Sequence, residues 1–140
     1  MEDVREALLD MVRRRQIGFL HIGLPCKTWG PAGRLAGGSR RLGLPLGAGH
    51  LARERQANGE LDFALTLCAE LVAQGGHFSL ENPDSSYVFH APGFAMLTQA
   101  CKIHEARLDQ CMYGLKLPGQ EPGHFCRKRT RIVSSMPGIV

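Results

Sequence analysis

The sequence predicts an α/β fold, a single Rossmann-like domain with a mostly parallel sheet over residues 1–140. Two short apolar runs, residues 17–24 and 77–80, each stop abruptly at a polar segment, as buried strands do. A segment with helical apolar spacing lies between them. Strands that alternate with helices are typical of parallel βαβ units, and 140 residues suit one domain.

Residues 1–16 are expected to form an amino-terminal helix. Val4, Leu8 and Val12 recur at helical spacing, acidic residues stand in the first turn, and three arginines stand in the last. Residues 17–24 then predict a strand that is apolar on both faces, as central parallel strands are.

A long basic loop is expected over residues 25–50, because this stretch is rich in glycine, proline and arginine. A second helix should begin near Leu51 or Asn58 and end near Gln74, before the glycine pair 75–76. Its apolar stripe includes Cys68, which we expect in the core.

The carboxyl-terminal half predicts a strand at 77–80, a loop at 81–92 and a short helix opened by Pro92. Further strands are expected at 106–110 and 129–134, with a turn-rich hairpin over 113–123. Because crossover connections are right-handed, the strands at 17–24 and 77–80 should be parallel neighbours.

The charge distribution suits a polyanionic partner, although an ordinary basic surface would look the same. The net charge is +4, and six Lys/Arg stand between residues 26 and 55 against one acid, Glu54. No apolar run approaches the roughly 18 residues of a membrane span, so no membrane partner is expected. Five cysteines without paired spacing indicate reduced thiols and an intracellular protein.

Two reactive side chains follow the predicted strands. Cys26 comes after Pro25 at the end of the first strand, with Lys27 beside it, and neighbouring positive charge favours the nucleophilic thiolate. Glu81 follows the strand at 77–80, where a half-shielded carboxyl group can donate a proton. Carboxyl ends of parallel strands meet at one crevice, so a nucleophile and an acid are expected to share it.

A row of arginines forms a third element near the carboxyl end. Arg127, Arg129 and Arg131 alternate along an extended segment and could grip a phosphate or carbonyl oxygen together. The same row would also serve as a charged edge strand that blocks strand pairing.

In this order the three elements resemble the DNA (cytosine-5) methyltransferase family, whose catalytic half carries Pro-Cys, Glu-Asn and Arg-x-Arg motifs. The resemblance covers about residues 17–135 and implies that Cys26 attacks C6 of a flipped-out cytosine while Glu81 holds its N3 edge. It further implies that Arg129 and Arg131 contact the base and its pocket. The resemblance gives supporting roles to Pro25, Asn82 and Pro83. The basic residues expected to contact nucleic acid are Lys27, Arg34, Arg40, Arg41, Arg127 and Lys128.

The chain departs from the family in its cofactor segment. No Phe-x-Gly-x-Gly motif for S-adenosylmethionine precedes Cys26, and the glycines near Gly47 follow a poor strand. Pro83 replaces the usual valine, and Arg127 replaces a glutamine. The resemblance therefore implies an incomplete catalytic half that acts on DNA, or on RNA, with a complementary chain to supply the cofactor pocket. The alternative is a non-catalytic nucleic-acid-binding module of the same fold.

The last third of the sequence also contains residues that could bind zinc. The sequence brings five potential ligands into its last third, but their spacing is irregular, so no metal is expected. These residues are Cys101, His104, Cys111, His124 and Cys126.

Overall fold

The computed structural model describes residues 2–115, 118–119, 121, 123 and 127–138. The elements in chain order are α1 (Glu2–Arg13), β1 (Phe19–Gly23), η1 (Pro31–Ala36), α2 (Ala52–Ala73), β2 (His77–Pro83), η2 (Tyr87–His90), α3 (Pro92–Ala100), β3 (His104–Asp109), η3 (Gln110–Tyr113) and β4 (Arg129–Ser134). The predicted helices and the last strand are confirmed. The expected hairpin over 113–123 falls partly outside the described residues.

The four strands form one mixed sheet in the order β1-β2-β4-β3. β1 and β2 are parallel neighbours, as predicted, with Phe19 opposite His77 and Gly23 opposite Glu81. The other two pairings, β2 with β4 and β3 with β4, are antiparallel. The prediction of an α/β fold is confirmed, but the prediction of a mostly parallel sheet is wrong, because β4 returns from β3 and inserts beside β2 rather than crossing over a helix.

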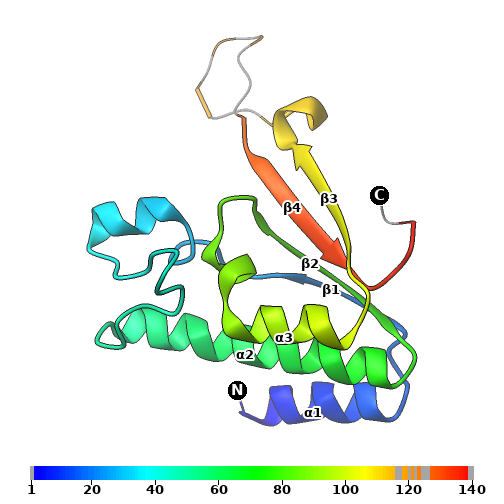
Figure 1. Cartoon of the computed structure of the whole chain (residues 1–140). Coiled ribbons are helices and arrows are strands. Elements are labelled where there is room, and N and C mark those ends of the chain that lie inside the picture. The colour runs from blue at the N-terminus through cyan, green and yellow to red at the C-terminus, as the bar shows by residue number, and fades with distance from the viewer. Residues whose placement is uncertain (1, 116–117, 120, 122, 124–126, 139–140) are drawn as a thin grey trace.

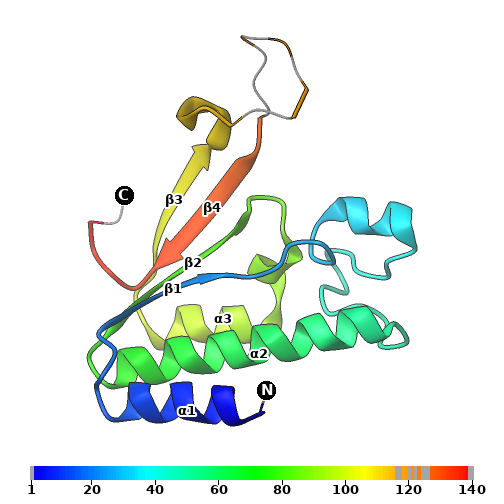
Figure 2. The same ribbon diagram turned by 180° about the vertical axis from the view of Figure 1, so that it is seen from behind.

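The helices lie on one face of this sheet (Figures 1 and 2). Among the described residues, no helix covers the opposite face. Apolar side chains of α2, including Leu61 and Leu71, pack with Phe78 and Leu80 of β2, and all four are almost fully buried. Cys68 is also completely buried, as expected. Its pKa is raised to about 12, chiefly by burial, so it is an inert core residue.

β1 lies at an edge of the sheet, not in its centre as the sequence predicted. Phe19 is 44% exposed, and the strand alternates between exposed and half-buried positions. An apolar run of this length suits either location, and only the partner strands decide it. β2 also differs from the prediction, since it continues through Glu81, Asn82 and Pro83.

The 25–50 loop is fastened to the first turns of α2 by a buried polar network. The Arg40 guanidinium stacks on Trp29 at 3.5 Å and donates to Asn58 Oδ1 at 2.8 Å. The Glu54 carboxylate accepts from the Ser39 amide at 2.8 Å and from the Ser39 hydroxyl. Arg40 is only 2% exposed. It was predicted to contact nucleic acid, but its guanidinium is buried and donates to Pro45 in the loop and to Glu54 and Asn58 in α2, which does not favour such a contact.

In the part of the chain that the structure describes, no helix is both long and apolar enough to cross a membrane.

Candidate functional site

The parallel pairing of β1 and β2 brings Glu81 close to the segment that carries Cys26. Gly23, the last residue of β1, is the register partner of Glu81. The Glu81 Oε2 atom lies 3.9 Å from the point where a β-carbon on Gly23 would stand. Cys26 follows three residues later and is exposed, and three residues span at most about 10 Å. The predicted approach of the two side chains is thus compatible with the register.

Hydrogen bonds hold the Cys26 segment at both ends. The Asn82 side-chain amide donates to the Leu24 carbonyl at 3.1 Å, and the Tyr87 amide donates to the Trp29 carbonyl at 2.8 Å. Between them, the Trp29 amide donates to the Cys26 carbonyl at 3.1 Å and closes a turn. Asn82 therefore positions the chain just before Pro25 and Cys26.

Polar atoms without partners mark the end of β2. Glu81 Oε1 and Asn82 Oδ1 are both buried, and neither has a hydrogen-bond partner among the described residues. Buried polar atoms in proteins are nearly always hydrogen-bonded. A ligand on the Glu81 side of the sheet that donates hydrogen bonds would satisfy Glu81 Oε1, whereas Asn82, the next residue of the strand, faces the opposite side. The N3–H and amino groups of a protonated cytosine are donors of this kind.

Strand alternation separates the arginine pair from Glu81. Glu81 is opposite Ile132, whereas Asn82 is opposite Arg131, so the Glu81 and Arg131 side chains leave opposite faces of the sheet. The Arg131 guanidinium lies on the helix side, 4.6 Å from the Phe89 ring centroid and 2.9 Å from Asp84 Oδ1. The structure therefore does not bring the predicted arginine pair and Glu81 together on one face.

Carboxylates engage the arginine row. Arg127 and Arg129 lie 3.3 Å and 3.1 Å from Asp109, and both are exposed. The pKa of Asp109 is lowered, first by the Arg129 hydrogen bond. Burial would raise the pKa of Asp84, but hydrogen bonds and positive charge from Arg131 and Arg107 outweigh it, so that pKa is lowered too. Sequence reasoning missed Asp84, although it directly follows Pro83.

The remaining predicted nucleic-acid contacts lie on the surface. Lys27, Arg34, Arg41, Arg127 and Lys128 are all exposed. Lys27 also lines a hollow of about 280 Å³ together with Arg53, a residue that was not predicted as part of the site. The sequence feature that could have pointed to Arg53 is its place among the six basic residues between positions 26 and 55.

The described residues do not fit S-adenosylmethionine. Gly47, before α2, serves an internal purpose, because a β-carbon there would overlap the Glu54 carboxylate. α1 leads directly to β1, with no strand and glycine-rich turn between them. No reaction step on this chain can therefore be assigned to that cofactor.

The zinc constellation gains no support where it can be judged. The Cys101 thiol donates to the Leu97 carbonyl at 3.4 Å, and its pKa is raised by burial. Among the described residues no three His, Cys, Asp or Glu side chains are grouped to hold a metal. His124 and Cys126 lie outside the described residues.

Comparison with protein-family models, curated proteins and solved structures finds no match to this chain. Any functional assignment therefore depends on its own residues and their geometry.

Proposed function

We propose that this chain is a nucleic-acid-binding catalytic half-domain of the DNA (cytosine-5) methyltransferase type, in which Cys26 forms an adduct with a flipped cytosine. The observation that carries the proposal is the pairing of Gly23 with Glu81, which sets a carboxylate beside the short, tethered segment that ends in an exposed thiol. Glu81 faces the side of the sheet that the described helices leave open.

The chemistry requires both groups. C6 of cytosine is a poor electrophile until N3 gains a proton or a strong hydrogen bond. In the proposed step, the Cys26 thiol gives its proton to water and its sulfur bonds to C6. The electrons of the C5–C6 double bond move toward C4 as N3 takes a proton from Glu81. C5 then takes a proton from water, which leaves hydroxide. The original C5 hydrogen leaves as a proton to that hydroxide, N3 returns its proton to Glu81, and the sulfur departs with the electrons of the C6–S bond, which restores cytosine with an exchanged hydrogen.

Methyl transfer would need a further component. S-adenosylmethionine would supply the methyl group, and we propose that a complementary chain holds it, because the described residues do not. The residues of this chain would bind and activate the base. DNA is the proposed substrate. The assay described next also includes RNA, because the same chemistry could take place on RNA.

The test is exchange of the C5 hydrogen, which needs only this chain and a substrate. A single-stranded DNA oligonucleotide with tritium at cytosine C5 avoids the few kcal/mol that base flipping costs, and a matched RNA forms the second arm. Tritium release should fall to background in Cys26→Ser. It should fall about 100-fold or more in Glu81→Gln, the usual range for a lost general acid. Cys111→Ser is the matched control and should keep full activity.

Release that persists in Cys26→Ser, or its absence from the unmodified chain with both oligonucleotides, would refute the catalytic proposal.

A non-catalytic binding module is the second candidate, favoured by the exposed positions of Lys27, Arg34, Arg41, Arg127 and Lys128. In that case affinity for a single-stranded oligonucleotide should fall steeply with salt and should survive Cys26→Ser. Each phosphate contact that is removed should reduce the salt slope by about 0.7 for single strands. Fluorescence anisotropy at several salt concentrations measures both quantities. A flat salt dependence would contradict this second candidate.

A further inference from the structure

The two edges of the sheet differ in their protection. β3 forms one edge and carries Glu105, Arg107 and Asp109, charged side chains that discourage strand pairing. β1 forms the other edge with the sequence Phe-Leu-His-Ile-Gly, which contains no Lys, Arg or Pro. Edges that are both apolar and unprotected are templates for another strand.

The backbone of β1 presents donors and acceptors on its outer side. The Gly18 carbonyl accepts from the His77 amide at 2.9 Å, so Gly18 faces β2. The direction of the backbone N–H and C=O groups alternates along a strand. Those of Leu20 and Ile22 therefore also point toward β2, while those of Phe19, His21 and Gly23 point outward, away from the sheet. Within the described part of the chain, no backbone hydrogen bond engages these three outward residues.

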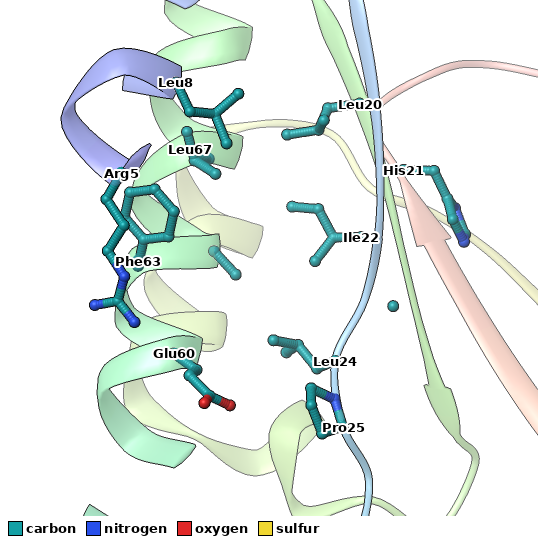
Figure 3. A pocket seen from close by; sticks show the side chains of 12 residues that line it. Arg5, Leu8, Leu20, His21, Ile22, Leu24, Pro25, Glu60, Phe63 and Leu67 are labelled. Carbon is teal, nitrogen blue, oxygen red and sulfur yellow. The ribbon is translucent and has the colours of Figure 1, made fainter. Parts of the chain in front are cut away.

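An apolar groove runs beside this edge, between β1 and the helices α1 and α2. It measures about 400 Å³ and is lined by Leu8, Leu20, Ile22, Phe63 and Leu67, among others. Figure 3 shows Leu20 and Ile22 pointing into the groove from the strand, with Leu8 and Leu67 opposite them and His21 turned away. Side chains at alternate positions of an added strand would enter this groove.

The chain exposes more surface in total than a typical monomer of its mass. The chain exposes 8550 Å², whereas a monomer of 15.4 kDa typically exposes about 7,200 Å². The excess is of the order that one partner buries in a stable complex, about 800 Å² or more.

The shape of the groove decides whether a second copy of this chain or a different polypeptide would fill it. A second copy related by a two-fold axis would set groove against groove, because such an interface uses the same patch on both chains. Two hollows that face each other bury little surface. The groove instead needs a convex partner with bulky side chains.

We propose that the β1 edge binds an extended segment of a different polypeptide, which adds a strand to the sheet and inserts large apolar side chains at alternate positions into the α1–β1–α2 groove. This mode of recognition combines main-chain hydrogen bonds with side-chain pockets. The inference stands independently of the chemistry proposed for Cys26.

The probe is a phage-displayed library of random twelve-residue peptides, selected on the whole chain. Selected peptides should carry large apolar residues with period two. His21→Pro removes an outward amide of β1 and should weaken their binding at least 10-fold. Glu105→Pro makes the matched change on β3, where Gln110 donates to the Lys128 carbonyl and thereby sets Glu105 outward. That control should retain binding.

Hydrogen exchange provides a second readout that needs no variant. The amides of Phe19, His21 and Gly23 should become protected in the wild-type chain when a selected peptide is added. Failure to select any peptide, equal binding by His21→Pro that remains folded, or unchanged exchange at these amides would overturn the proposal. Sedimentation that shows a dimer abolished by His21→Pro would assign the edge to a second copy instead.

Discussion

Two arginine-rich regions look alike in the sequence, but one arginine from each, Arg40 and Arg129, has a different environment in the fold. In the 25–50 loop, Arg40 is 2% exposed, stacks on Trp29 and joins the network around Glu54. In β4, Arg129 is exposed and shares one carboxylate with Arg127. Arg40 links the loop to α2, whereas Arg129 lies on the surface. Positive charge alone therefore says little about binding, and substitutions should separate the two regions.

The largest effect is expected for Arg40→Ala. Removal of this guanidinium leaves the Glu54 carboxylate buried without its nearby positive charge, and such a loss costs about 3–5 kcal/mol. Urea unfolding followed by circular dichroism would measure the change in the free energy of unfolding. A loss below about 1 kcal/mol would show that the loop network does not stabilise the fold and would remove the contrast with β4.

Glu54→Gln should change how stability depends on pH. Burial would raise the pKa of Glu54, but hydrogen bonds from Ser39 and the charge of Arg40 outweigh it, so the folded-state pKa is lowered. The ionised carboxylate therefore stabilises the fold above its ordinary pKa of about 4.3. That contribution disappears as pH falls through the lower folded value.

Thermal unfolding between pH 3 and pH 7 would test this. The wild-type chain should lose more stability across the acidic range than Glu54→Gln, and the two should converge at the lowest pH. Parallel curves for the two proteins would contradict the assignment.

Arg131→Ala should have an intermediate effect. Its guanidinium is half-buried, stacks on Phe89 and donates to Asp84 Oδ1 at 2.9 Å. Hydrogen bonds to charged groups contribute about 1.5–3 kcal/mol, and the neighbouring Arg107 would retain part of the Asp84 interaction. We expect a loss of roughly 1–2 kcal/mol in urea unfolding. A larger loss than that of Arg40→Ala would reverse the proposed ranking.

The smallest effect is expected for Arg129→Ala. Exposed ion pairs add little to stability, and Arg127 also contacts Asp109. The urea concentration at the unfolding midpoint should therefore not change measurably, while any binding of a single-stranded oligonucleotide should lose part of its salt dependence. Unchanged oligonucleotide affinity at low salt would place Arg129 outside the binding surface.

The elements that the sequence predicted well are those with a local signal. The apolar stripe of α2, the glycine pair after it and Pro92 at the start of α3 each fix a boundary through nearby residues. The parallel pairing of β1 and β2 followed from the crossover rule and was also correct.

The elements that the sequence missed depend on contacts between distant residues. β4 inserts between β2 and β3, so the sheet is mostly antiparallel, and nothing in residues 129–134 alone reveals this. Burial of Arg40 depends on Trp29 and Asn58, and the opposite faces of Glu81 and Arg131 depend on strand register. The order of the motifs predicted a site, but only the register shows which side chains share a face.

The central claim is that Cys26 and Glu81 act on one pyrimidine, and an adduct measurement tests it most directly. The chain would be incubated with a single-stranded oligonucleotide that contains 5-azacytosine, whose C6 is more electrophilic than that of cytosine. Peptide mass mapping would then locate the added nucleotide among the five cysteines. The proposal predicts addition at Cys26, reduced at least 10-fold in Glu81→Gln. Addition spread over other cysteines, or equal in the Glu81→Gln variant, would contradict it.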